Sequence, residues 1–197
     1  MGLTYWDTHP QMKTSSALLA DDFPEHYAKL KTYFSNTDII LDVGCGTNIF
    51  SKYIPNATGV DEKTDLITYD LSKYNTLHFS ESIGYIGHDV LTRLITDSNI
   101  KKVVIKDFLT NKNPDGVEEY FSYEFGTLNN FILPLLKQSG YTVKVEEFFP
   151  SIKKFIELMD KIGLGYIGKG KLFFVKSWNP LVLTMKPVVV TAIKKLV

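Results

Sequence analysis

The sequence IILDVGCGTNIF, residues 39–50, carries the signals that decide the fold of this chain. Its first half is apolar and β-branched, which is typical of a strand buried on both faces. Gly44 and Gly46 follow, and the residues after them begin a helical pattern that Pro55 ends. This stretch therefore predicts a buried strand, a glycine turn and a helix, in that order.

The glycine turn is a candidate ligand site. Glycine has no Cβ, so the turn can adopt a positive φ and its backbone can approach a ligand closely. The N-terminus of the following helix directs N–H groups toward the same place. Asn48 stands where a third glycine is often found, and asparagine tolerates left-handed backbone. We expect the turn to keep its shape and bind a ligand; the alternative is a turn that only caps a helix.

Predicted strands and helices alternate along the rest of the chain. This alternation is typical of an α/β fold with a largely parallel sheet, which binds ligands beyond the carboxyl ends of its strands. The predicted strands cover residues 38–43, 57–60, 66–69, 76–80, 101–108, 141–149 and 170–178. The predicted helices cover residues 23–34, 48–54, 87–98, 127–140 and 150–163, and Pro134 predicts a kink in the fourth of them.

The acids around the turn narrow the class of ligand. Asp42 comes two residues before Gly44, and its carboxylate would repel a pyrophosphate at the helix N-terminus. A P-loop is excluded because the turn lacks Gly-Lys-Ser/Thr. Asp61 lies 15 residues after Gly46, about where a ribose-binding acid is expected. A cationic or zwitterionic ligand tolerates this pattern.

These two motifs, LDVGCGTN at residues 41–48 and GVDEK at residues 59–63, resemble the first two motifs of the class I S-adenosylmethionine-dependent methyltransferases. The usual form in that family is Asp-x-Gly-x-Gly-Thr-Gly, followed by an acid that closes the second strand. The resemblance extends to four further segments, residues 74–86, 101–108, 139–149 and 170–178. It covers roughly residues 36–178 and implies S-adenosylmethionine as the cofactor.

The fold implied by the resemblance is a Rossmann-like, doubly wound, largely parallel sheet with an antiparallel closing strand. Only four residues separate Asp61 from Leu66, whereas a parallel crossover needs about a dozen. We therefore expect the fold to be shortened between its second and third strands. Residues 66–69 are then either a short irregular strand or no strand.

The resemblance also implies roles for individual residues. Residues of the turn should line the methionine part and the ribose of the cofactor: Asp42, Gly44, Cys45, Gly46 and Asn48. Asp61 should accept hydrogen bonds from the ribose hydroxyls. Residues at the ends of later segments should meet the adenine or close the strand beneath the sulfonium: Glu62, Asp70 and Leu71 for the adenine, Phe79 and Ser80 for the strand.

Methyl transfer from a sulfonium needs an in-line nucleophile, a water-excluding pocket and sometimes a base. The loop after the fourth strand of that fold offers three candidate catalytic residues: Glu81, Tyr85 and His88. Histidine titrates near neutrality, which suits a base. The alternatives are a solvated loop acid, a core aromatic residue and a neighbour of the next helix cap.

Two further segments are candidates for substrate binding. Tyr5 and Trp6 belong to an N-terminal segment that either encloses a substrate as a lid or packs on the domain. Tyr120 and Tyr123 belong to an aromatic, acidic segment, residues 115–128. That segment is either a pocket wall for a cationic substrate or an amphipathic surface helix.

The chain divides into three expected regions: an N-terminal helical lid segment (1–35), the methyltransferase core (36–178) and an apolar, basic C-terminal extension (179–197). In the extension, Pro187 suits the first turn of a short helix. A helix of this composition needs a surface to pack on. That surface is its own domain, the second subunit of a homodimer, or the face of a membrane in a peripheral contact.

Composition limits the partners and the compartment. Lys+Arg and Asp+Glu total 22 each, so nucleic acid is not an expected partner, although seven lysines and no acid follow Asp160. Cys45 is the single cysteine and the N-terminus has no signal-peptide layout, which together favour a cytoplasmic protein. The scattered histidines predict no metal site.

The leading hypothesis is a methyltransferase that acts on a small molecule by in-line transfer. One alternative is an RNA- or protein-modifying methyltransferase that docks through its basic end. The other is a non-catalytic module that retains the cofactor fold. No Asn-Pro-Pro-Tyr or Asp-Pro-Pro-Tyr follows the fourth strand, which argues against the enzymes that methylate amino groups of nucleic acids.

Overall fold

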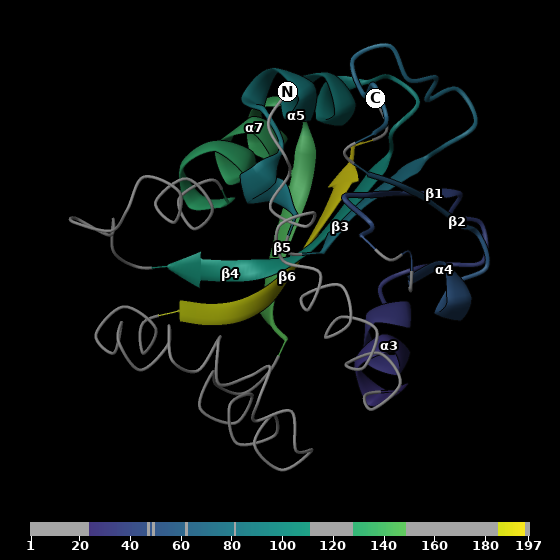
Figure 1. Cartoon of the computed structure of the whole chain (residues 1–197). Helices are drawn as coiled ribbons and strands as arrows, with labels where there is room; N and C mark the ends of the chain where they lie inside the picture. The colour runs from purple at the N-terminus through teal and green to yellow at the C-terminus, as the bar shows by residue number, and fades with distance from the viewer. Residues whose placement is uncertain are drawn as a thin grey trace.

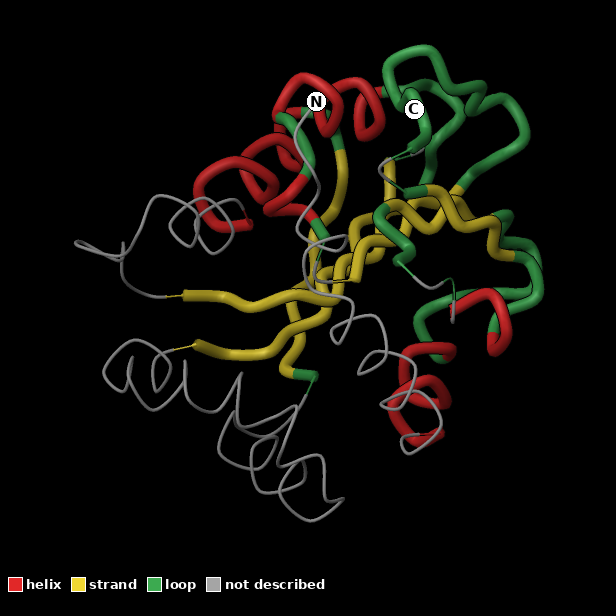
Figure 2. The backbone as a smooth tube through the Cα atoms, in the orientation of Figure 1, coloured by secondary structure: helices red, strands yellow, loops and turns green. Residues whose placement is uncertain are grey.

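The computed structural model describes residues 24–46, 48, 50–61, 63–80, 82–110, 128–148 and 185–195. At its centre is a six-stranded sheet with the strand order β2-β1-β3-β4-β6-β5 (Figures 1 and 2). The strands are β1 (Ile40–Val43), β2 (Ala57–Val60), β3 (Thr76–Ser80), β4 (Lys102–Thr110), β5 (Tyr141–Glu147) and β6 (Met185–Lys194).

The direction of the strands defines one functional edge of the sheet. β1 pairs in parallel with β2 and β3, and β3 pairs in parallel with β4. β6 runs antiparallel to both of its neighbours, β4 and β5. The carboxyl ends of β1, β2, β3 and β4 therefore meet at one edge, which is where such sheets bind ligands. The predicted α/β fold with an antiparallel closing strand is confirmed.

Helices cover both faces of the sheet. The helices α3 (Pro24–Lys31) and α4 (Phe50–Tyr53) lie on one face, and α5 (His88–Thr96) and α7 (Leu133–Gln138) lie on the other (Figure 1). A 3-10 turn, η1 (Ile83–Tyr85), precedes α5, and a π turn, η2 (Leu128–Ile132), precedes α7. Pro134 lies in the first turn of α7, where its missing N–H costs least, and a kink at this residue stays a prediction.

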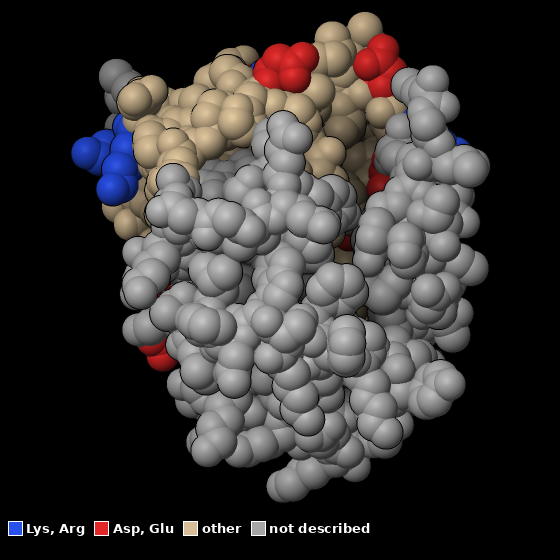
Figure 3. All heavy atoms as spheres, turned by 60° about the vertical axis from the view of Figure 1, so that its left-hand side comes forward, with Lys and Arg blue, Asp and Glu red and all other residues tan. Residues whose placement is uncertain are grey.

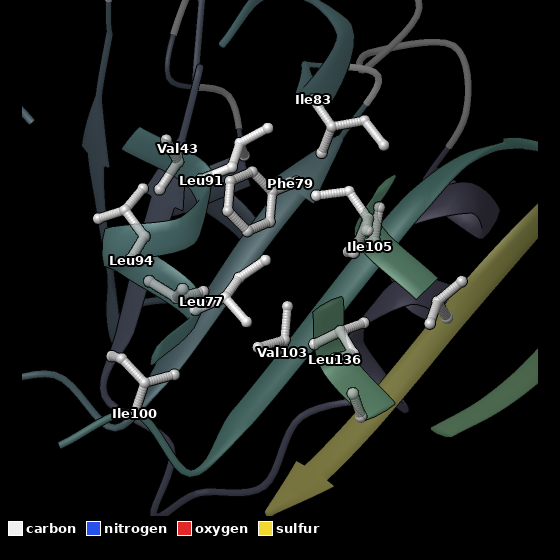
Figure 4. Packing of buried hydrophobic residues seen from close by; sticks show 14 of the residues in the cluster. Val43, Leu77, Phe79, Ile83, Leu91, Leu94, Ile100, Val103, Ile105 and Leu136 are labelled. Carbon is white, nitrogen blue, oxygen red and sulfur yellow. The ribbon is translucent and has the colours of Figure 1, made fainter. Parts of the chain in front are cut away.

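Strand side chains alternate between two apolar cores because successive residues point to opposite faces. The larger core joins the sheet to α5 and α7, and Figure 4 shows its side chains converging: Val43, Leu77, Phe79, Leu91, Leu94, Val103, Ile105 and Leu136. The smaller core joins the sheet to α3 and α4 and contains Leu30, Ile40, Phe50, Ile54, Val104, Phe148 and Val189. The central strands are thus buried on both faces, as their apolar sequences predict.

The fold is shortened after β2, as predicted: β2 is followed by β3, the strand expected at residues 76–80, with no helix or strand described between them. Residues 63–75 contain no helix or strand, and residues 66–69 form a turn in place of the irregular strand considered for them. The Arg93 guanidinium of α5 donates hydrogen bonds to the carbonyl oxygens of Leu66 and Tyr69, at 2.9 and 2.6 Å. These bonds fix the loop on the face that a crossover helix would otherwise cover.

The prediction that the C-terminal segment is an extension outside the sheet is wrong for the residues that the structure describes. Within residues 179–197, Met185–Lys194 form β6, which is paired on both sides inside the sheet, and no helix starts at Pro187. β-Branched residues favour a strand over a helix, and here long-range pairing decides between them. The buried side chains alternate between the two cores: Val188, Val190 and Ala192 on one face and Val189 on the other.

β6 therefore packs on its own domain, the first of the three placements expected for this segment. A homodimer or membrane contact stays an untested prediction. The predicted helix 150–163 and strand 170–178 lie outside the described residues. Among the helices that the structure describes, none is long and apolar enough to cross a membrane.

A buried hydroxyl on β6 leads to a stability prediction. The Thr191 Oγ1 atom is buried and has no hydrogen-bond partner among the described residues. An unpaired buried polar group costs about 1–3 kcal/mol, so Thr191→Val should raise the free energy of unfolding by about 1 kcal/mol. Urea unfolding measures this change. As a control, Thr76→Val should destabilise the protein, because the Thr76 hydroxyl donates to Asn75 Oδ1 at 2.9 Å; destabilisation by Thr191→Val as well would contradict the prediction.

Candidate functional site

The glycine turn lies at the carboxyl end of β1, on the functional edge of the sheet. Three of its residues have left-handed backbone: Gly44 has φ +75°, Gly46 has φ +55° and Asn48 has φ +55°. Asn48 is the one non-glycine residue with a positive φ in the described part of the chain. The predicted backbone conformation of Asn48 is therefore confirmed, and the turn keeps its shape without a third glycine.

Substitution of Asn48 tests this conformation. Asn48→Gly should leave stability nearly unchanged, because glycine adopts left-handed backbone without steric cost. Asn48→Val should lower the free energy of unfolding by about 2 kcal/mol, because a β-branched residue resists a positive φ. Chemical denaturation of both variants measures the difference. Equal stability of the two variants would show that the position is not left-handed in solution.

Hydrogen bonds from both neighbouring strands hold the turn. The N–H groups of Gly44 and Cys45 both donate to the carbonyl oxygen of Val60 on β2, at 2.9 and 3.1 Å. From the other side, the buried Ser82 hydroxyl donates to the carbonyl oxygen of Val43 at 2.7 Å. The turn is thus fastened between the end of β2 and the loop that follows β3.

Close packing beneath the turn explains two of the glycines. A Cβ on Gly44 would lie 2.5 Å from Ser82 Cβ, and a Cβ on Gly59 would lie 2.3 Å from Asn48 Oδ1. Both separations are far shorter than a carbon contact allows. A Cβ on Gly46, by contrast, would have no heavy atom of the described part of the chain within 4 Å. The turn is therefore tightly packed at Gly44 and Gly59 and open at Gly46.

The charges near the turn are negative. Burial and, after it, the carboxylates of Asp42 and Asp61 raise the pKa of the Cys45 thiol to about 12. The thiol is therefore protonated at neutral pH and is a poor nucleophile. The same two carboxylates favour a ligand that carries positive charge or offers hydrogen-bond donors.

Asp42 lies beneath the turn and not on its surface. Asp42 Oδ1 accepts a hydrogen bond from His78 Nδ1 at 2.7 Å, and the exposed fractions of the two side chains are 4% and 0%. The Phe50 ring stacks on the imidazole with the ring centroids 4.0 Å apart. A buried carboxylate needs such a partner, since its desolvation is otherwise costly. Contact of Asp42 with a ligand stays a prediction.

The residues predicted to meet the adenine or close the next strand have mixed placements. The Asp70 carboxylate is exposed and accepts hydrogen bonds from the N–H and hydroxyl of Ser72, which lower the pKa of Asp70. Leu71 and Phe79 are 2% and 0% exposed, so their side chains serve the core and a ligand would reach only their backbone. Ser80 is half-buried at the carboxyl end of β3.

Two of the predicted catalytic residues lie on the functional edge. Tyr85 ends η1 and is 42% exposed, and His88 is exposed and opens α5. The His88 ring stacks on Phe131 of the π turn, with centroids 3.9 Å apart and planes 9° apart. Because Ser82 touches the glycine turn, the η1 segment that follows it lies beside that turn. π turns are frequent at functional sites, so Phe131 joins this group of candidates.

Several predicted site residues lie outside the described residues: Tyr5, Trp6, Glu62, Glu81, Tyr120 and Tyr123. In the part of the chain that the structure describes, no group of three or more His, Cys, Asp or Glu residues is arranged to hold a metal ion. Sequence analysis did not identify three residues that support the turn: Gly59, His78 and Ser82. Gly59 carried a signal, because glycine inside a strand often marks a close backbone approach.

Comparison with known proteins gives a likeness in structure and none in sequence. No family model matches the chain, and no curated protein matches its sequence. Phosphoethanolamine N-methyltransferase 2 from Haemonchus contortus matches over 99% of this chain and 61% of its own, with a TM-score of 0.65 and 14% identity. Geranyl diphosphate C-methyltransferase from Streptomyces coelicolor A3(2) matches over 91% and 79%, with a TM-score of 0.53 and 12% identity.

The fold is that of the class I methyltransferases. At such low identity the likeness shows the fold alone, and the chain spans about three fifths of the length of the Haemonchus contortus enzyme. A third match, the [4+2]-cyclase SpnF, has a TM-score of 0.54 and 13% identity over 94% of this chain and 81% of its own. Since this neighbour is a cyclase, the methyltransferase fold by itself does not decide the reaction.

Proposed function

We propose that this chain is an S-adenosylmethionine-dependent methyltransferase that acts on a small molecule. The observation that carries the proposal is the turn after β1, with left-handed backbone at Gly44, Gly46 and Asn48, fastened to the end of β2 next to Asp61. The structures of the Haemonchus contortus and Streptomyces coelicolor enzymes contain S-adenosyl-L-methionine and S-adenosyl-L-homocysteine, respectively. These neighbours support the same cofactor here.

The residues of the turn fit this cofactor in shape and charge. The space at Gly46 lets the backbone approach a ligand, because no heavy atom of the described residues lies within 4 Å of a Cβ placed there. The carboxylate of Asp61 is a suitable acceptor for paired ribose hydroxyls. Asp42 and Asp61 both act electrostatically on Cys45 within the turn, and they complement the positive charges of the cofactor.

The main task of the protein in this reaction is to position the methyl acceptor. S-adenosylmethionine, when bound, supplies an electrophilic methyl group on a sulfonium. The residues around it then bind the acceptor, align it and exclude water. Among the described residues, Tyr85 and His88 are our candidates to orient an acceptor or remove its proton, because both lie on the loop beside the turn.

A small acceptor is favoured over a nucleic acid. Two of these structural neighbours are named for phosphoethanolamine and geranyl diphosphate. The chain has equal numbers of basic and acidic residues, 22 each, which gives weak attraction to a polyanion. On the face in Figure 3, the largest group of basic side chains of the described residues lies at the left, while acidic side chains lie at the top, at the lower left and toward the right.

Two measurements test the proposal. Calorimetric titration should show one S-adenosylmethionine per chain, with a dissociation constant of about 1 μM–1 mM, the usual range of Michaelis constants for enzyme substrates. Transfer of a radiolabelled methyl group should then be measured to phosphoethanolamine, geranyl diphosphate and total RNA. Labelled RNA would favour the RNA-modifying alternative. Cofactor binding without transfer to a wide acceptor panel would favour the non-catalytic module.

A further inference from the structure

We propose that His78 is a positioning residue that holds both flanks of the glycine turn and thereby sets the affinity for S-adenosylmethionine. The inference deepens the proposed function and rests on it for the identity of the ligand. Sequence spacing gives no hint of it, because His78 lies 36 residues from Asp42. It follows from two contacts made by one imidazole ring.

The first contact is with the residue that precedes the turn. β1 and β3 are neighbours, and their register places His78 opposite Asp42 with both side chains on the α3/α4 face. Nδ1 donates to Asp42 Oδ1 at 2.7 Å, and both side chains are buried. A buried carboxylate is costly unless it is paired, so this bond fixes the position of Asp42.

The second contact is with the residue that follows the turn. Phe50 is the first residue of α4, and its ring stacks on His78 with centroids 4.0 Å apart and planes 17° apart. The Phe34 ring also contacts the imidazole of His78 in an edge-on arrangement, with the ring centroids 5.5 Å apart. Such ring contacts restrain both partners and add to the stability of apolar burial. The imidazole therefore contacts the chain both before and after the turn.

The tautomer agrees with a positioning role. A proton on Nδ1 makes the bond to Asp42, and Nε2 is buried without a hydrogen-bond partner among the described residues. The ring has a way to hold Asp42, but no onward described partner through which to relay a proton.

Holding both flanks matters because the turn between them is rich in glycine. Glycine loses more conformational freedom on ordering than any other residue. Ordering an unrestrained turn when the ligand binds would therefore cost conformational entropy and weaken the binding. A turn that is already ordered binds its ligand more tightly. We therefore expect the two contacts of His78 to be measurable as cofactor affinity and as order in the ligand-free turn.

Two substitutions of His78 test its contacts with Asp42 and Phe50 separately. His78→Phe keeps a ring to stack on Phe50 but leaves Asp42 without its donor. His78→Asn loses the ring but keeps a donor near the place of Nδ1. The control is Val103→Ala, a truncation of a fully buried residue on the opposite face of the sheet, which should lower stability without touching either flank.

The readouts are the dissociation constant for S-adenosylmethionine, measured at a temperature where every variant is folded, and hydrogen exchange of the turn amides in the ligand-free protein. His78→Phe should weaken binding about tenfold or more, and His78→Asn should weaken it less, by about threefold. Both should speed exchange of the Cys45 and Asn48 amides, which are hydrogen-bonded in the turn. Val103→Ala should leave affinity and exchange at wild-type values.

Wild-type affinity and wild-type exchange in His78→Phe would overturn the inference while leaving the proposed function in place. If that variant does not fold, the same result in His78→Asn overturns it. A wild-type protein that does not bind S-adenosylmethionine would overturn the proposed function. In that case the exchange measurement still decides whether His78 orders the turn.

Discussion

Replacing Gly44 with alanine should lower the free energy of unfolding by about 3 kcal/mol and remove most of the cofactor binding. Gly44 has φ +75°, and left-handed backbone costs about 1–2 kcal/mol for a residue with a Cβ. The new Cβ would also lie 2.5 Å from Ser82 Cβ and 3.0 Å from Ser82 Oγ. Since the Ser82 hydroxyl donates to the Val43 carbonyl, moving it would also break a buried hydrogen bond.

Gly46→Ala is the matched control for this variant. Gly46 also has a positive φ, +55°, but a Cβ placed there would meet no heavy atom within 4 Å in the part of the chain that the structure describes. It should therefore show only the backbone cost of about 1–2 kcal/mol. Denaturant unfolding of both variants separates conformational strain from steric overlap. An equal loss in the two variants would contradict the close packing of Ser82 under Gly44.

Replacing Asp61 with alanine should weaken S-adenosylmethionine binding more than tenfold and leave the fold intact. A hydrogen bond to a charged acceptor is worth about 1.5–3 kcal/mol, and the ribose offers two hydroxyl donors to the same carboxylate. Asp61 directly follows β2, next to the Val60 carbonyl that holds the turn. Calorimetric titration of the variant measures the loss.

Asp65→Ala is the control for Asp61→Ala. Asp65 is an exposed acid of the same loop, and its carboxylate accepts hydrogen bonds from the Ile67 N–H and the Thr68 hydroxyl, at 3.1 and 2.8 Å. Removing it changes the net charge by the same amount but should leave cofactor affinity within about twofold, as expected for a screened surface charge. An Asp61→Ala variant with wild-type affinity would remove Asp61 from the site.

Sequence analysis predicted the elements whose signals are local. The strands expected at residues 57–60 and 76–80 match β2 and β3 residue for residue, because each is a short β-branched or aromatic run bounded by turn residues. The left-handed backbone of Asn48 was predictable because few residues can replace glycine at such a position. The absence of a helix directly after β2 was predictable because only four residues separate Asp61 from Leu66.

Features that depend on distant partners were not predictable. The spacing of residues 187–196 suits a helix, but residues 187–194 belong to a central strand that pairs with β4 and β5. Only the sheet, which brings together segments far apart in sequence, shows which structure is favoured. The contact of His78 with Asp42 also depends on the register of β1 against β3. Ser82 supports the turn through a contact that no local pattern marks.

If the turn after β1 holds the cofactor, a crystal structure with S-adenosylhomocysteine should show the ligand there. We expect both ribose hydroxyls to lie about 2.6–3.2 Å from the Asp61 carboxylate. We also expect the amino-acid part of the ligand to lie against the backbone at Gly44 and Gly46. Ligand bound elsewhere on the protein, with this turn empty, would contradict the account.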